Sequence, residues 1–416
     1  MARGPDRAVR ASASSTTAMS CGSAAAGSAP GDSAAAAPEL VALELFRLPI
    51  DFFSLEPAAQ WEAMASVAVK PEKLTKPKKP CKMTLGEEAL AVAWFSVAFG
   101  LPLFLLVGTL GLLAVRPRHL LWWLPGVAAL ALHPLPRWGP LQRRHKMGVI
   151  IAKYFTVTFL LDRSSHPDYA TAGTPTVEDN PMPAPVVALA CPHGVINFGA
   201  IVWVYFSRWV MGLEQYTAGV SIVSKVPGLR YLVAPISVIP VDRNSLKRRL
   251  QEPVRLTDEK GQRLSAKVPR TGGMIGIVPD GIAGIFKSKS GEDVLFIGKK
   301  RGLMRICLEE GAFIMAGWFA STNEMFRIVT DPFGCLEWLS RRLKVSLFVP
   351  LGRWGTPVPH RVAVTLCPHL VRCKKEAAPT EEQVESLHGE VYHGLSRRYE
   401  ELRHFAGYPE RRLVIL

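Results

Sequence analysis

The chain has 416 residues, of which 48% are hydrophobic, and its mean hydropathy of +0.15 is high for a purely soluble protein. Its 50 Lys and Arg against 35 Asp and Glu give a formal charge of +15, which suits nucleic acid, anionic lipid or a phosphorylated substrate. No zinc-finger spacing or aromatic RNA-binding signature accompanies this charge, so nucleic acid is not an expected partner. The seven scattered cysteines, an odd number, indicate a reducing compartment rather than a disulfide framework.

The N-terminal residues 1–38 are rich in Ala, Ser and Gly and hold few acids. Such a composition cannot bury a core, so a disordered tail is predicted. The early Arg3, Arg7 and Arg10 among many serines are also typical of an organelle transit peptide, and that alternative stays open.

Residues 39–85 join an apolar part, which ends near Val69, to a lysine cluster that runs from Lys70 to Lys82. We expect an amphipathic, basic linker whose apolar part forms a helix at a lipid interface. The linker precedes the most hydrophobic part of the chain.

Two apolar runs follow in residues 86–135. The first, 89–115, has 27 positions without a charge, and a bilayer span needs ~20 apolar residues. The second, 120–132, has 13 residues and is short for a span. Dense positive charge at 70–82 and 143–146 flanks both sides, so we predict a membrane hairpin that enters from the cytosolic face. For the second run, a buried helix is the alternative.

From residue 145 to 416 short apolar strands alternate with amphipathic helices, which predicts an α/β domain. Strands are expected at Val186–Ala190, Ser237–Val241, Met274–Val278, Phe313–Phe319 and Val345–Val349, and helices after Asn244, over Gly302–Glu310 and from Glu381 to Phe405. The last helix is supported by apolar residues three or four apart and by a capping-box pair, Thr380 and Gln383.

The stretch Cys191-Pro192-His193-Gly194 directly follows the first of these strands. This placement puts one imidazole at the carboxyl edge of a sheet, where open α/β folds bind ligands. Histidine is the usual general base at neutral pH, with an unperturbed pKa of ~6.5. His193 is therefore the candidate catalytic residue, and a buried structural histidine is the alternative.

Four blocks in this part of the chain, taken in order, resemble the type-2 diacylglycerol acyltransferases and their monoacylglycerol and wax-forming relatives. They are Cys191-Pro192-His193-Gly194 with Gly199-Ala200; Val226-Pro227-Gly228-Leu229-Arg230 with Pro240-Val241-Asp242-Arg243; Val278-Pro279-Asp280-Gly281-Ile282-Ala283-Gly284 with Lys299 to Gly302, Gly311-Ala312, Phe319 and Asn323-Glu324; and Pro379 to His388 with Tyr399-Glu400 and Gly407-Tyr408-Pro409. The resemblance covers residues 145 to 416 and implies an acyltransferase-like mixed sheet flanked by helices, preceded by the membrane hairpin.

The resemblance implies transfer of a fatty acyl group from acyl-CoA to diacylglycerol, which forms triacylglycerol. Acyl-CoA is then a substrate and no cofactor or metal is expected. His193 is the general base, and Cys191, Pro192, Gly194 and Gly281 support the box and the oxyanion. Expected further site residues are Asp280 as an assisting acid, Lys299, Lys300 and Arg301 for the phosphates of acyl-CoA, and Arg243, Asn323 and Glu324 as family-matched structural or substrate residues. For the three cations, a basic loop against the membrane surface is an equal alternative.

Three positions depart from the pattern of the family. Cys191 stands for the first histidine of the box, and Gly284 stands where the family commonly has a glutamate. Phe198 stands where soluble-faced glycerolipid acyltransferases have an aspartate, so that dyad is absent, and Asp280 and Asp242 are the candidates for an aspartate supplied from across the fold. We expect that Cys191 is not a nucleophile, because the thioester of acyl-CoA is already activated.

Several alternatives remain at this point. The acceptor is diacylglycerol, monoacylglycerol or a fatty alcohol, and a non-catalytic lipid-droplet or membrane-shaping protein is a further possibility. A lipid hydrolase is disfavoured because the chain has no Gly-x-Ser-x-Gly elbow. The expected location is the endoplasmic reticulum membrane, as a multi-pass or hairpin protein, with the plastid envelope or the lipid-droplet surface as alternatives. The protein is also a candidate homo-oligomer.

Overall fold

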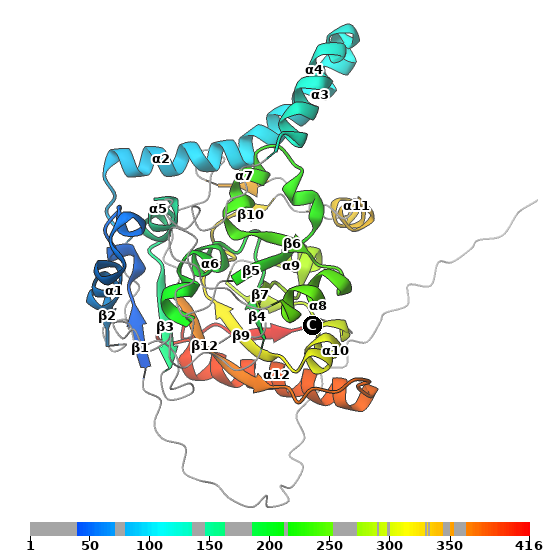
Figure 1. Ribbon diagram of the computed structural model, residues 1–416. Coiled ribbons are helices and arrows are strands. Elements are labelled where there is room, and N and C mark those ends of the chain that lie inside the picture. The colour runs from blue at the N-terminus through cyan, green and yellow to red at the C-terminus, as the bar shows by residue number, and fades with distance from the viewer. Residues whose placement is uncertain are drawn as a thin grey trace, which may run out of the picture. The chain divides into compact units, whose positions relative to one another are not determined.

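A computed structural model describes most of the chain beyond residue 39 (Figure 1). The described residues are 40–70, 80–134, 146–162, 185–211, 215–252, 273–288, 291–297, 300–328, 331, 333–343, 350–352 and 363–416. The predicted tail at 1–38, the expected strand at 345–349 and Lys299 lie outside this part of the chain.

The fold is built on a mixed sheet with the strand order β2-β1-β3-β12-β9-β4-β7-β5-β6. Strands β9, β4, β7, β5 and β6 run parallel to one another, whereas β12 is antiparallel to β9, and β1 is antiparallel to β2 and β3. The bounds are β1 Leu40–Leu43, β2 Ala68–Val69, β3 Thr158–Asp162, β4 Val186–Cys191, β5 Gln215–Gly219, β6 Val238–Pro240, β7 Met274–Ile277, β9 Phe313–Phe319 and β12 Ala363–Arg372. The predicted α/β class with a mixed sheet is confirmed.

Helices cover the sheet, and two small strand pairs complete the fold (Figure 1). The pairs are β8 Asp293–Leu295 with β13 Leu413–Ile415, and β10 Arg327–Ile328 with β11 Pro350–Leu351. The helices of the α/β part are α5 Met147–Tyr154, α6 Phe198–Met211, α7 Leu229–Val233, α8 Arg243–Gln251, α9 Gly281–Lys287, α10 Gly302–Glu310, α11 Cys335–Leu343 and α12 Glu381–Leu402.

Strand β9 and helix α10 have the predicted bounds, and α12 begins where its capping box predicts. Thr380 Oγ1 accepts a hydrogen bond from the Gln383 N–H at 3.2 Å, and Gln383 Oε1 accepts from the Thr380 N–H at 2.9 Å. The periodic apolar side chains of α12 are all buried, as the pattern predicts: Val384, Leu387, Val391, Leu395, Tyr399 and Leu402.

Residues 40–69 are not a linker, and the prediction of an interfacial segment is wrong for them. Strand β1 extends the sheet, pairing Leu40 with Asp162 and Leu43 with Phe159 of β3. Helix α1, Pro57–Ser66, and two 3₁₀ turns follow, and Phe52 and Phe53 are fully buried. The segment packs on α5 and α6, with the rings of Phe53 and Phe206 5.3 Å apart. Its apolar side chains therefore belong to the protein core rather than to a lipid interface.

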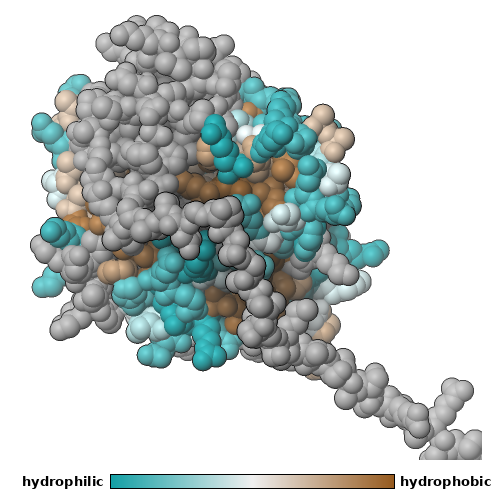
Figure 2. Space-filling view, turned by 90° about the horizontal axis from the view of Figure 1, so that it is seen from below, coloured by the Kyte–Doolittle hydropathy of each residue, from teal (hydrophilic) through white to brown (hydrophobic). Residues whose placement is uncertain are grey.

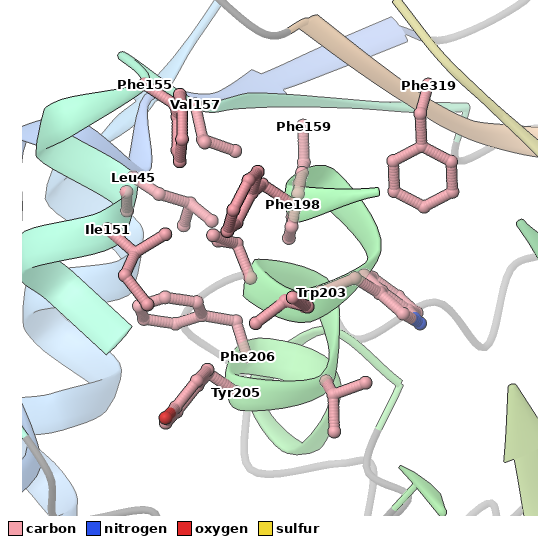
Figure 3. Close-up of a cluster of buried hydrophobic side chains, with 14 of the residues drawn as sticks. Leu45, Ile151, Phe155, Val157, Phe159, Phe198, Trp203, Tyr205, Phe206 and Phe319 are labelled. Atoms are coloured by element: carbon pink, nitrogen blue, oxygen red, sulfur yellow. The ribbon is translucent and has the colours of Figure 1, made fainter. Parts of the chain in front are cut away.

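Figure 3 shows the core into which this N-terminal segment packs. Leu45 meets Ile151 of α5 and the aromatic side chains of α6, among them Phe198 and Phe206. A fully buried aromatic or aliphatic side chain stabilises a fold by about 1.5–3 kcal/mol relative to exposure. The segment before the apolar runs is thus part of the same folded unit as the rest of the sheet.

The two apolar runs form helices that lie side by side. Helix α2, Leu85–Phe95, continues through a π-helical turn into α3, Leu101–Val115, and this 31-residue stretch is long and apolar enough to cross a membrane. Helix α4, Leu120–Leu132, returns along α3. The Trp123 indole donates to Thr109 Oγ1 at 2.8 Å, and Gly108 leaves room for that ring, because a Cβ there would lie 2.8 Å from it.

The C-terminal end of α4 is held by a buried arginine of the α/β part. Arg230 Nη1 donates to the carbonyls of Leu130 and Ala131 at 2.8 and 2.5 Å, and Nη2 donates to that of His133 at 2.6 Å. A guanidinium at this position satisfies carbonyls that the helix leaves open and complements the helix dipole. Arg230 belongs to the second family-like block, so this block contacts the apolar helices.

Candidate active site

Three turns meet at the carboxyl edge of the parallel strands. Strand β4 lies between β9 and β7, with Cys191 opposite Trp318 and Leu189 opposite Ile277. The turns that follow these three strands therefore leave the sheet next to one another. They hold the box at 191–194, the Pro279-Asp280-Gly281 turn and the turn at 321–324.

His193 is half-buried and is fixed through its backbone and its ring. Its backbone N–H donates to Asp280 Oδ2 at 3.0 Å. Its ring Nδ1 lies 3.0 Å from the carbonyl oxygen of Gly194, which accepts a hydrogen bond when Nδ1 carries the proton. This contact favours the neutral tautomer whose Nε2 is basic, which is the form that a general base needs.

Asp280 is fully buried beside the His193 turn. Burial raises the pKa of its carboxyl group, and the nearby His193 and Lys300 oppose that shift only in part. Its second oxygen, Oδ1, has no hydrogen-bond partner within the described part of the chain. Lys300 Nζ donates to the carbonyls of Pro279 and Asp280 at 3.2 and 2.8 Å, so it fixes the turn itself.

Glycines allow the close approach of these turns. Gly194 has φ +59°, and a Cβ there would lie 2.8 Å from the carbonyl oxygen of Thr322. At Gly284 a Cβ would lie 2.1 Å from Asp280 Oδ2. The Asp280 carboxylate thus occupies the space where a side chain at position 284 would begin, and this position is where the family commonly has a glutamate.

Of the two aspartates considered from the sequence, only Asp280 reaches the box. Asp242 is exposed, and its carboxylate accepts from the Ser245 N–H at 3.0 Å as the N-cap of α8. The next residue, Arg243, binds both oxygens of Glu309 at 2.5 and 2.7 Å. Arg243 therefore joins α8 to α10 and has a structural role in this arrangement.

Asn197 was not predicted as a site residue. Its Nδ2 donates to the carbonyl of Pro192 at 2.9 Å, and its Oδ1 accepts from the Ala200 N–H at 2.8 Å. It thus caps the start of α6 and holds the box at the same time. An asparagine directly before an apolar helical run is the signal that could have indicated it.

Helix α6 begins at Phe198, which connects the box to the apolar helices. The Phe198 ring lies 5.3 Å from that of Phe95 and 6.3 Å from that of Phe99. Phe99 also contacts Phe326, with ring centroids 5.4 Å apart. The α2–α3 stretch therefore contacts Phe198, which lies five residues after His193 in the chain.

Cys191 is fully buried at the end of β4. Burial raises the pKa of its thiol well above the usual range, and the neighbouring Asp280 carboxylate adds to the shift. Only the thiolate is strongly nucleophilic, so this environment disfavours Cys191 as a nucleophile.

Asn323 and Glu324 lie in the turn behind Gly194 and hold other segments. Asn323 accepts from Ser288 Oγ at 2.6 Å and donates to the Glu292 carbonyl at 2.7 Å. Glu324 pairs with Arg411, which lies 3.8 Å from the Asp293 carboxylate. Asp293 also accepts from the Tyr399 hydroxyl at 3.0 Å. These contacts tie the C-terminal residues to the site edge.

The predicted cations are divided between two roles. Lys299 lies outside the described residues, and Lys300 fixes the Asp280 turn. Arg301 binds Glu385 of α12 through Nε and Nη2, the latter at 2.9 Å, and its Nη1 lies 2.7 Å from His388 Nε2. A cluster of His, Cys, Asp and Glu able to hold a metal is absent from the described residues, which exclude the side chains of Cys367 and His369.

Comparison with known proteins shows the class to which this arrangement belongs. The family model described as diacylglycerol acyltransferase matches residues 186–416, which is more than half of the chain. The protein therefore belongs to the diacylglycerol acyltransferase family, and the resemblance drawn from the four blocks is confirmed.

Its relatives include proteins named for two acceptors. It is 21% identical over 241 residues to the human diacylglycerol O-acyltransferase 2-like protein 6. This match covers 53% of the present chain and 66% of the relative. It is 28% identical over 140 residues to the bovine 2-acylglycerol O-acyltransferase 1, covering 30% and 41%, and 24% identical over 237 residues to the human 2-acylglycerol O-acyltransferase 3, covering 53% and 65%. The chain thus spans less than two thirds of the length of each of these relatives. No solved structure matches it.

Proposed function

We propose that the protein transfers a fatty acyl group from acyl-CoA to diacylglycerol and so forms triacylglycerol, with His193 as general base. The observation that carries the proposal is the contact of His193 Nδ1 with the Gly194 carbonyl at 3.0 Å, which leaves Nε2 as the basic nitrogen. Monoacylglycerol is the second candidate acceptor, because two of the relatives above are named as 2-acylglycerol acyltransferases.

The chemistry needs only a positioned base and an oxyanion site. Nε2 of His193 takes the proton of the acceptor hydroxyl as its oxygen attacks the thioester carbonyl. Backbone N–H groups in the turns at Gly194 and Gly281, both with positive φ, are the candidate donors to the oxyanion. When the C–S bond breaks, the coenzyme A thiolate leaves and takes the proton back from the imidazolium.

Asp280 supports this role as a positioning residue. Its bond to the His193 N–H fixes the backbone of the box, and its burial keeps water from competing for that bond. Burial also raises the pKa of the Asp280 carboxyl group, and such shifts are common at functional sites.

The phosphates of acyl-CoA are proposed to bind at Lys299, Lys300 and Arg301. Arg301 would have to exchange Glu385 for a phosphate. Glu385 is 63% exposed, and exposed ion pairs contribute little to stability, so the loss of this pair costs little. The start of α10 directly follows Arg301 and favours an anion further.

We also propose that α3 and α4 form a membrane hairpin. Strand β1 precedes the apolar helices and β3 follows them, and the two strands pair residue by residue. Both flanks must therefore lie on one side of the membrane. Helix α2 packs on α5, so α3 and α4 are the parts of the stretch that can insert. By the rise per residue they are ~22 and ~20 Å long, less than a ~30 Å hydrocarbon core, which favours a wedge that enters and leaves by the same face. The endoplasmic reticulum membrane is the proposed location.

The test of the catalytic proposal uses purified membranes, labelled acyl-CoA and a panel of acceptor alcohols. His193→Ala should abolish acyl transfer to every acceptor, whereas Cys191→Ser should keep substantial activity. Activity of His193→Ala within a few-fold of the wild type would exclude His193 as the base. Equal membrane content of the variants is the control.

The hairpin is tested by protease protection in sealed microsomes. Sites before residue 80 and after residue 146 should be cut together or protected together. Cleavage on one flank only would contradict the hairpin.

A further inference from the structure

Helix α11 and Phe333, two residues before its start, present large hydrophobic side chains to solvent. Phe333 is 88% exposed, Trp338 63% and Leu339 36%. The exposed Arg341 and Arg342 lie on the same helix. We call these five residues the α11 surface.

The α11 surface has the composition of a helix that lies at a lipid interface. Trp and Phe supply apolar surface that inserts near the headgroups, and arginines attract anionic lipids at ~1 kcal/mol per charge near the surface. The Arg342 guanidinium lies 5.9 Å from the Trp338 ring centroid, one helical turn away, so charge and ring occupy one face. Phe333 and Trp338 leave a large apolar area exposed to water, and Arg342 adds a positive charge beside Trp338, whereas the charge of Arg341 is offset by Glu337.

The position of the α11 surface connects it to the candidate active site. Helix α11 packs against α9, which begins directly after Asp280. The pKa of Lys300, which fixes the Asp280 turn, is lowered by burial and also by the charge of Arg341, so this arginine lies near that turn. Lipid that gathers at α11 would thus lie next to the helix that carries one site turn.

The location within the fold agrees with a second membrane contact. In Figure 1, α11 lies in the upper half with α2, α3 and α4, whereas α12 forms the lower edge. On the face seen from the α12 side, many of the coloured side chains that project outward are hydrophilic, with hydrophobic areas between them (Figure 2). Among the described residues outside 85–132, Phe333 and Trp338 are the most exposed of the large hydrophobic side chains.

We propose that the α11 surface docks on the headgroup region of an anionic bilayer and seats the α9 side of the domain on the membrane that supplies the lipid acceptor. The proposal rests on the proposed function for the identity of that acceptor, but the contact of the α11 surface with lipid does not depend on it. It adds to the α3–α4 hairpin a second anchoring point, which fixes the orientation of the domain as well as its attachment.

The test uses the full chain in nanodiscs that contain a diazirine-bearing phosphatidylserine, with the cross-linked peptides mapped by mass spectrometry. We expect label on peptides from 333–343 as well as from 101–132, and the latter serve as the internal control for lipid access. Arg342→Glu should reduce the label on 333–343 about fivefold. The matched control is Arg248→Glu on α8, because Arg248 is exposed like Arg342 and undergoes the same reversal of charge outside the α11 surface.

A kinetic measurement tests the consequence for substrate supply. Phe333→Ala/Trp338→Ala should raise the KM for the lipid acceptor, expressed as its mole fraction in the bilayer, about tenfold, with the KM for acyl-CoA within twofold. Label on 101–132 without label on 333–343 overturns the proposal. So does cross-linking of α11 to a second copy of the chain or to another protein in place of lipid. If the wild-type protein shows no acyl transfer but is labelled at 333–343, the proposed function is refuted and the α11 contact is supported.

Discussion

The replacement Gly284→Ala probes the link between Asp280 and His193 without touching either residue. An alanine Cβ at this position would lie 2.1 Å from Asp280 Oδ2, whereas a normal carbon–oxygen contact is ~3.2 Å or more. The carboxylate must retreat by ~1 Å. The bond from the His193 N–H to Oδ2, now 3.0 Å, would then lengthen to ~4 Å and be lost.

The loss can be expressed as a rate. A hydrogen bond to a charged group contributes ~1.5–3 kcal/mol, and ~1.4 kcal/mol corresponds to a factor of ten. Gly284→Ala should therefore lower kcat for acyl transfer by about 10- to 150-fold. Asp280→Ala should cause a similar loss, and adding Gly284→Ala to it should cost little more, because the two changes remove the same bond.

The assay is steady-state kinetics with labelled acyl-CoA at saturating acceptor. Gly389→Ala on α12 is the matched control, because a Cβ there meets only the edge of His393 at 4.0 Å and should leave kcat unchanged. The double variant Asp280→Gly/Gly284→Glu moves the carboxylate to position 284, where the family commonly has a glutamate, and should recover part of the activity. A folded Gly284→Ala protein with kcat within twofold of the wild type would refute the reasoning.

Two further predictions concern charge. Burial raises the pKa of Asp293 to about 6, above its usual 3.8. The folded state therefore binds the proton of this carboxyl group more tightly than the unfolded state does. The stability that the bound proton contributes is present at low pH and is lost as the pH rises through 6. The unfolding free energy of the wild type should therefore fall by ~2 kcal/mol more than that of Asp293→Asn between pH 4.5 and 7.5 in denaturant titrations, and parallel profiles would contradict the assignment. Neutralising Lys299, Lys300 and Arg301 together should raise the KM for acyl-CoA several-fold, with an effect that weakens in high salt. If the KM stays unchanged while binding to anionic vesicles falls, the stretch is a membrane contact.

The elements that the sequence predicted correctly are those with a local cause. Helix α12 has its capping box and its apolar stripe in one segment, and β9 is a short apolar run between turn residues. Strand β1 was missed because its partner β3 lies more than a hundred residues further along the chain. A pattern read over ten residues cannot distinguish an apolar segment that completes a sheet from one that lies on a membrane.

The candidate site divides in the same way. His193 could be predicted from its place after a strand, but the choice between Asp280 and Asp242 depended on which turns the sheet order brings together. The pairing of Arg301 with Glu385 also joins residues 84 positions apart, so no local signal predicts it. The reason for a glycine at position 284 is visible only in the structure, where the Asp280 carboxylate occupies the space of a Cβ.

The insertion of the apolar helices between β1 and β3 has a consequence for how the protein is made. During synthesis β1 and β2 leave the ribosome before the apolar helices, and β3, the second partner of β1, leaves after them. The sheet edge therefore stays incomplete until the hydrophobic segment has emerged and found its place, and pairing over so long a separation is intrinsically slow. A shortened protein that starts at residue 145 would retain every candidate catalytic residue, yet it would expose the bare edge of β3 and the core surface that Phe52 and Phe53 cover. The part of the chain that holds the candidate catalytic residues thus depends on core contacts from residues that precede the apolar helices.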